Sequence, residues 1–150
     1  MDPAHRSADC VLLADAHHAL SEGIRRLLAT TFGTVVMVAD EVSLFESARR
    51  LQSDLVVIDL RLPQGDSIGF VRSFRMRFQT TKMIIISDYD IPAVVKATMD
   101  AGANGYVMKR ALASDLLDAV DAVLTGNAYV SPEIRMHPGK AAGESARSGP

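Results

Sequence analysis

The chain has 150 residues, of which 48% are hydrophobic and 23% are charged, and its formal net charge is −2. This is the profile of one ordinary globular domain, and it excludes two full domains. The mixed, near-neutral charge gives no basic footprint for nucleic acid, and no apolar run approaches the ~20 residues of a membrane helix. We expect neither a signal peptide nor a membrane span. The single cysteine, Cys10, excludes an internal disulfide and fits a reducing cytoplasm.

Five short apolar segments recur along the chain and predict buried β-strands. Several lack polar alternation, which is typical of parallel strands that helices cover on both faces. The segments span residues 11–14, 35–38, 55–58, 83–86 and 106–108.

Amphipathic helical patterns lie between and after these strands. Their apolar stripes are Leu20, Ile24, Leu27 and Leu28; Leu44, Ala48 and Leu51; Val71, Phe74 and Phe78; a weaker stretch over 94–101; and Leu116, Val120, Val123 and Leu124. On the last helix we expect Asp115, Asp118 and Asp121 to face water. Ser43 and Glu46 predict a capping box at the start of the second helix.

The resulting order is (βα)₅, with Pro92 in the first turn of the fourth helix, where proline is tolerated. Right-handed crossovers between parallel strands leave few topologies open. We therefore predict an α/β fold, a doubly wound five-stranded parallel sheet in the order 2-1-3-4-5 that flavodoxin and CheY share. In such sheets ligands bind beyond the carboxyl ends of the strands.

A polar residue stands at the carboxyl end of four predicted strands: Asp15, Asp59, Ser87 and Lys109. Because parallel strands end at one edge of the sheet, we expect these side chains to converge. Two carboxylates, a hydroxyl and an ammonium suit a divalent cation and a phosphoryl group, with one carboxylate as the nucleophile. No glycine-rich loop follows the first strand, which argues against a flavin or dinucleotide site.

These residues lie in blocks that resemble the receiver domain of two-component response regulators, the CheY-like family. The blocks are VLLADAH (11–17), DLVVIDLRLP (54–63), IIIS (84–87) and GANGYVMK (102–109). The resemblance runs from about residue 10 to residue 126. Residues 127–133, which contain YVSPE, are similar to the start of the linker in the NarL/LuxR branch, whose members regulate transcription.

The resemblance implies that Asp59 is the phosphoacceptor, supplied by a sensor histidine kinase or a small phosphodonor. Ser87 and Lys109 would bind the acyl phosphate, and Tyr106 would be the aromatic residue whose rotamer reports the state. The implied activity is signalling, with self-catalysed phosphotransfer and dephosphorylation at most. The implied output is a surface of the fourth helix, fifth strand and fifth helix, or of the first and fifth helices, that binds a downstream protein or a second copy.

The resemblance also implies a Mg²⁺ site made by Asp15, Asp59 and the backbone carbonyl of Arg61. This chain departs from the family at Ala16, where relatives usually carry a second acid that ligates Mg²⁺ directly. Mg²⁺ prefers octahedral oxygen ligands, so we expect weakened binding. His17 suits softer metals, and we expect it and His18 to face solvent rather than a metal.

Simpler interpretations compete with several of these roles. Asp15 and Ser87 could cap the helices that follow them, and Tyr106 could be a packed strand residue. Arg72, Arg75 and Arg77 are expected on a solvated helix face, next to phenylalanines.

We expect a receiver domain over residues 9–127, followed by a linker remnant and flexible tail over 128–150 that is too short for a DNA-binding domain. The chain would then be a stand-alone receiver or a fragment of a longer regulator. The principal alternative is a receiver-like interaction module that works without phosphorylation, because Ala16 removes an acid. A small α/β enzyme that uses Asp59 for acid–base chemistry has less support.

Overall fold

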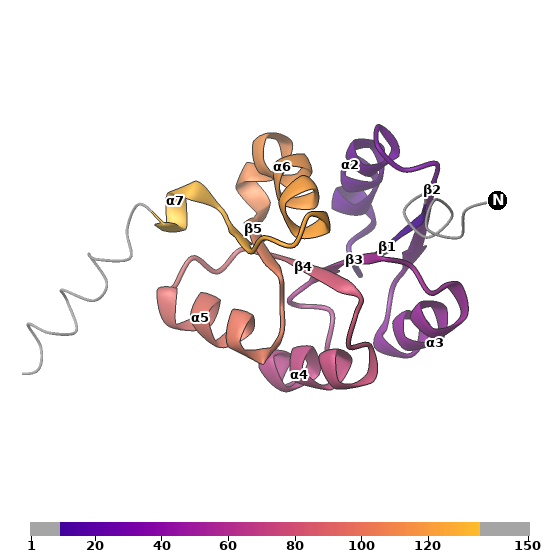
Figure 1. The fold of residues 1–150 in the computed structure, drawn as a ribbon, viewed down its shortest axis with the longest axis horizontal. Coiled ribbons are helices and arrows are strands. Elements are labelled where there is room, and N and C mark those ends of the chain that lie inside the picture. Colours follow the sequence, from indigo (N-terminus) through magenta and orange to yellow (C-terminus); the bar gives the residue numbers. More distant parts are fainter. Residues whose placement is uncertain (1–9, 136–150) are drawn as a thin grey trace, which may run out of the picture.

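The structure is a computed structural model that describes residues 10–135. Strands and helices alternate along the chain (Figure 1). The strands are β1 (Cys10–Ala14), β2 (Thr34–Val38), β3 (Leu55–Asp59), β4 (Lys82–Ser87), β5 (Gly105–Met108) and β6 (Tyr129–Val130). The helices are α2 (His18–Ala29), α3 (Glu41–Leu51), α4 (Ser67–Arg77), α5 (Pro92–Ala101), the 3₁₀ turn η1 (Lys109–Ala111), α6 (Leu112–Leu124) and α7 (Pro132–Arg135).

The sheet is parallel and has the order β2-β1-β3-β4-β5-β6, which confirms the predicted order of the first five strands. The expectation of only five strands is wrong, because Tyr129 and Val130 pair with Gly105 and Tyr106 as a sixth. A strand of two residues is too short to show an apolar period in the sequence. Of the segment expected as the linker, residues 129–131 bond to β5 at the sheet edge and α7 follows, while 136–150 are outside the described residues.

Helices cover both faces of the sheet, as continuous apolar strands require. Figure 1 shows α2 and α6 on one face and α3, α4 and α5 on the other. Side chains alternate along each strand: Val11 and Leu13 pack with α2 and α6, whereas Leu12 and Ala14 pack with the opposite layer. This three-layer core fixes the strands, so the residues at their carboxyl ends stand on a rigid edge. No helix within residues 10–135 is long and apolar enough to span a membrane.

The predicted capping box at Ser43 is wrong, because the second helix begins earlier. Asp40 is the N-cap of α3, and its carboxylate accepts a hydrogen bond of 2.8 Å from the Ser43 N–H. Aspartate is as good an N-cap as serine, so Asp40, three residues upstream of Ser43, takes the role. Pro92 occupies the first turn of α5, as predicted.

Asp115 is buried, contrary to the expectation that it faces water, whereas Asp118 and Asp121 are exposed. The Ser131 hydroxyl donates to Asp115 Oδ2 at 2.9 Å and accepts a hydrogen bond of 3.0 Å from the Met108 N–H. The segment that contains β6 folds back over this part of α6, and this return of the chain is not visible in the helical pattern alone.

Arg75 departs from the expected solvated face. Its guanidinium donates to the carbonyls of Gly102, Phe78 and Thr81 and to Asn104 Oδ1, at 2.7–3.0 Å. The side chain therefore joins the end of α4 to the end of α5, and burial lowers its pKa. Arg72 and Arg77 are exposed, as predicted.

Candidate functional site

Four polar residues stand at the carboxyl edge of the sheet, where the topology predicts a site. Asp59 and Ser87 are the last residues of β3 and β4, while Asp15 and Lys109 directly follow β1 and β5. β3 lies between β1 and β4 in the sheet, so Asp59 is central among them. The structure brings Asp15, Asp59 and Lys109 into one cluster.

Asp59 and Lys109 form a buried ion pair. The distance from Lys109 Nζ to Asp59 Oδ2 is 2.6 Å, and the two side chains are 9% and 1% exposed. The other carboxylate oxygen, Oδ1, accepts a hydrogen bond of 2.9 Å from the Arg61 N–H. A carboxylate taken out of water needs such partners, because desolvation of an unpaired charge is costly. Asp59 is thus held as an oriented, charge-compensated carboxylate.

Asp15 is buried with incomplete compensation. Its Oδ1 accepts a hydrogen bond of 2.8 Å from the His17 N–H, whereas its buried Oδ2 has no hydrogen-bond partner among residues 10–135. Burial and the charge of Asp59 raise the pKa of Asp15, and the His17 N–H and the charge of Lys109 oppose that rise. His17, not Asp15, is the N-cap of α2, so the simpler interpretation of Asp15 as a helix cap does not hold. An unpartnered carboxylate oxygen in this position fits a site for a cation.

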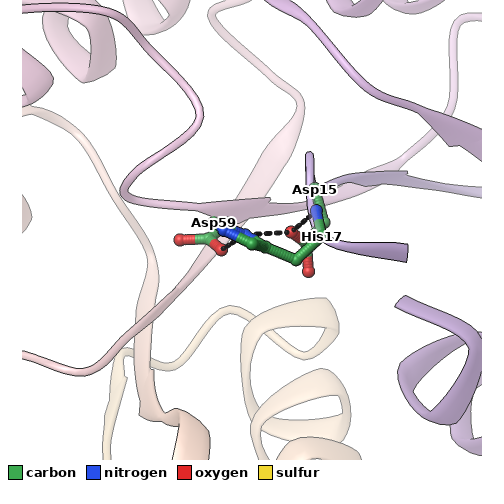
Figure 2. A group of neighbouring side chains, drawn as sticks. All are labelled: Asp15, His17 and Asp59. Carbon is green, nitrogen blue, oxygen red and sulfur yellow. Dashed lines mark hydrogen bonds and ion pairs between the residues drawn. The ribbon is translucent and has the colours of Figure 1, made fainter. Parts of the chain in front are cut away.

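His17 lies next to Asp15 and Asp59, although it was expected to face solvent and to take no part in the site. Its side chain is 53% exposed, as expected, but Nδ1 is 3.5 Å from Asp15 Oδ1 and 3.8 Å from Asp59 Oδ2. One possible ligand atom from each of the three residues lies within 4.8 Å of the other two (Figure 2). The sequence feature that could have predicted this place is that His17 comes two residues after Asp15, in the turn before α2, where both side chains lie at the sheet edge.

Ser87 and Tyr106 are both completely buried. The Ser87 hydroxyl accepts a hydrogen bond of 2.9 Å from the Tyr89 N–H, and the Tyr106 hydroxyl donates to the Tyr89 carbonyl at 2.7 Å. Ser87 does not cap a helix, since Ile91 is the N-cap of α5. Burial raises the pKa of Tyr106. Both side chains therefore hold the loop between β4 and α5.

The backbone N–H of Arg61 donates to Asp59 Oδ1 in the pocket, while the Arg61 side chain lies near the surface. The guanidinium, half exposed, is 3.5 Å from the Asp88 carboxylate, which lies 3.9 Å from Lys109 Nζ. The exposed Asp88 is thus a second acid near Lys109.

The pattern of the response regulator receiver domain family matches residues 11–121. The chain belongs to this family. Receiver domains are signalling domains that take phosphate from histidine kinases and generally bind Mg²⁺ through acidic residues. The receiver fold and the predicted family resemblance are therefore confirmed.

Curated relatives of this receiver are response regulators of the NarL/LuxR type. The nitrate/nitrite response regulator protein NarP of Escherichia coli is 29% identical over 129 residues, which are 85% of this chain and 60% of NarP. The transcriptional regulatory protein DegU of Brevibacillus brevis is 27% identical over 126 residues, which are 83% of this chain and 53% of DegU. This receiver thus spans between about half and three-fifths of their length.

A solved structure also resembles this receiver closely. It is a two-component response regulator of the LuxR family from Aurantimonas sp. SI85-9A1, with a TM-score of 0.80 and 30% sequence identity. The match covers 89% of this chain and 97% of that one.

Proposed function

We propose that this receiver accepts a phosphoryl group on Asp59 from a histidine kinase or a small acyl phosphate, and thereby switches a protein-interaction surface in the cytoplasm. The observation that carries the proposal is the buried contact of 2.6 Å between Lys109 Nζ and Asp59 Oδ2 at the carboxyl edge of the sheet. After the carboxylate has become an acyl phosphate, an ammonium in this position can form an ion pair with a phosphoryl oxygen.

In the transfer, a carboxylate oxygen of Asp59 attacks the phosphorus of the donor. The new O–P bond forms as the P–N bond to the kinase histidine breaks, and the electron pair leaves with the imidazole nitrogen, which takes a proton from water. Lys109 supplies positive charge to the transferred group, and the Ser87 hydroxyl can donate a hydrogen bond to it. Because both residues are held by rigid strand ends, little reorganisation is needed.

A divalent cation fits beside Asp59, since Asp15 Oδ2 is buried without a hydrogen-bond partner among the described residues. Asp15, Asp59 and the Arg61 carbonyl would hold it, and a bound cation would neutralise charge on the phosphoryl oxygens. Ala16 offers no ligand, so we propose that Mg²⁺ binds weakly.

Phosphorylation would change the interaction surface through Ser87 and Tyr106, the two residues that hold the β4–α5 loop. The Ser87 hydroxyl accepts a hydrogen bond from the Tyr89 N–H and would donate its own hydrogen to a phosphoryl oxygen, while the Tyr89 carbonyl accepts from the Tyr106 hydroxyl, so the three residues form one hydrogen-bonded chain. We place the output on α5, β5 and α6, or on α2 and α6, facing a downstream protein or a second copy. On the first of these surfaces, Arg110 bridges Asp90 and Glu133, so the segment after β6 is part of it.

The direct test is incubation with acetyl phosphate over a wide range of Mg²⁺ concentration, followed by intact-mass spectrometry. We expect the mass of one added phosphoryl group in the wild-type protein and in Asp88→Asn, which removes the exposed acid near Lys109, and none in Asp59→Asn. An unmodified wild-type mass at every Mg²⁺ concentration, with acetyl phosphate and with a histidine kinase, would refute the proposal.

A second candidate is an interaction module that works without phosphorylation. It is favoured by Ala16, which offers no ligand for Mg²⁺. This candidate predicts that Asp59→Asn leaves self-association unchanged in sedimentation, with or without acetyl phosphate. Self-association that rises with acetyl phosphate in the wild type only would exclude it.

A further inference from the structure

We propose that Asp15, His17 and Asp59 form a site for a borderline divalent ion, with Zn²⁺ preferred over Mg²⁺. The inference concerns the pocket of the proposed function and rests on that proposal only for the idea that the pocket takes a cation. It goes further by making His17 a ligand and by naming the class of metal.

The spacing of the possible ligand atoms of these three side chains suits an ion with tetrahedral coordination. His17 Nδ1 lies 3.5 Å from Asp15 Oδ1 and 3.8 Å from Asp59 Oδ2 (Figure 2). Ligands about 2.1 Å from a zinc ion stand about 3.4 Å apart at the tetrahedral angle. Neighbouring ligands of octahedral Mg²⁺, also at about 2.1 Å, stand only about 3 Å apart. These two separations are closer to the tetrahedral spacing than to the octahedral one, and the ligand atoms of the two acids lie within 4.8 Å of each other.

The buried oxygen of Asp15 is an independent sign that this pocket accepts a cation. The Asp15 side chain is fully buried, and its Oδ2 has no hydrogen-bond partner within residues 10–135. Lys109 does not supply that partner, because its ammonium pairs with Asp59 Oδ2 at 2.6 Å. A cation held between Asp15 and Asp59 would compensate the carboxylate that Lys109 leaves unpaired.

The kinds of donor atom in this pocket favour one class of metal. Ala16 takes away a hard oxygen ligand, and the His17 imidazole brings a nitrogen, which suits zinc and its neighbours better than magnesium. Three protein ligands leave one tetrahedral position open, as in zinc sites that bind a water or an exchangeable oxygen. His17 is half exposed, so the open position can face solvent.

The site can be tested by calorimetric titration of the full chain with ZnCl₂ and, separately, MgCl₂, without a phosphodonor. A Cys10→Ser background removes the one thiol, which lies at the opposite end of β1 from Asp15. We expect Zn²⁺ to bind more tightly than Mg²⁺, and His17→Asn to weaken Zn²⁺ binding by at least about tenfold. Mg²⁺ binding should change less than twofold in the same variant.

Two further variants make the result specific. His137→Asn removes another histidine and should leave Zn²⁺ affinity unchanged, while Ala16→Asp should shift the preference toward Mg²⁺. Visible absorption of Co²⁺, added in place of Zn²⁺, should appear in the wild type and be lost in His17→Asn. Equal Zn²⁺ affinity in wild type and His17→Asn, or a wild-type protein that binds Mg²⁺ as tightly as Zn²⁺, would overturn the inference. Because no phosphodonor is present, these outcomes are independent of whether Asp59 is phosphorylated.

Discussion

Replacement of Lys109 by methionine should destabilise the fold strongly, because it leaves two buried carboxylates with no cation. The ammonium is 2.6 Å from Asp59 Oδ2, and the two side chains are 9% and 1% exposed, which makes this a buried pair. Loss of one partner of a buried pair costs about 3–5 kcal/mol, against about 0–1 kcal/mol for an exposed pair. We expect Lys109→Met to lower the free energy of unfolding by about 3–5 kcal/mol at neutral pH.

The loss should depend on pH with a definite sign. The charge of Lys109 opposes the rise in the pKa of Asp15, so its removal raises that pKa further. A carboxyl whose pKa is higher in the folded state than in the unfolded state destabilises the fold at high pH, and this cost disappears as pH falls through the folded-state pKa. The deficit of Lys109→Met should therefore be largest at neutral pH and shrink on acidification.

Urea unfolding followed by far-ultraviolet circular dichroism measures the effect, since the chain has no tryptophan. Lys96→Met is a matched control, because Lys96 pairs with Asp100 at a similar distance of 2.7 Å but both side chains are exposed. That control should cost less than about 0.5 kcal/mol. A double-mutant cycle of Lys109→Met with Asp59→Asn should recover part of the loss. Equal, pH-independent losses in Lys109→Met and Lys96→Met would refute the reasoning.

Three other substitutions, one in the site and two where α4 and α5 end, can be tested by the same unfolding assay. Asp15→Asn should raise the free energy of unfolding by about 1–2 kcal/mol at neutral pH, and the gain should vanish as pH falls through the raised folded-state pKa of Asp15. Arg75→Met should cost about 2–3 kcal/mol by removing donors to four acceptors, while the exposed Arg72→Met should be near neutral. Gly102→Ala should cost about 2 kcal/mol or more, because φ is +129° and the new methyl carbon would lie 2.6 Å from the Arg75 side chain. Gly23→Ala, on an open face of α2, should instead stabilise by about 0.5–1 kcal/mol. The opposite sign for Asp15→Asn, or equal effects within either control pair, would contradict these arguments.

The sheet was predictable because its central strands carry their own signal. Residues 55–58 are apolar without interruption, and all four are completely buried between two helical layers. The sixth strand carries no such signal, since Tyr129 and Val130 are held by pairing with β5 and by the contacts of the neighbouring Ser131. Such pairing depends on a tertiary return of the chain, which local periodicity does not report.

The site was predictable to the extent that topology alone assembles it. Parallel strands bring Asp15, Asp59 and Lys109 to one edge whatever their side chains do, and the structure confirms that convergence. The place of His17 depends instead on a rotamer and on the turn before α2, neither of which the sequence pattern specifies. Arg75 was missed for a related reason: three of its four partners are backbone carbonyls, which have no signature in the sequence.

The charge balance of the pocket bears on which metal the proposed site would prefer. Asp15 and Asp59 bring two negative charges, and Lys109 offsets one of them. An acid at position 16 would add a third charge whose repulsion a cation would relieve, whereas Ala16 adds none. The cation-free pocket is therefore under less electrostatic strain, and a divalent ion gains less from charge neutralisation alone. Ion binding would then depend on the affinity of each donor for the metal, and the nitrogen donor of His17 would favour a borderline ion such as Zn²⁺ over a hard ion such as Mg²⁺.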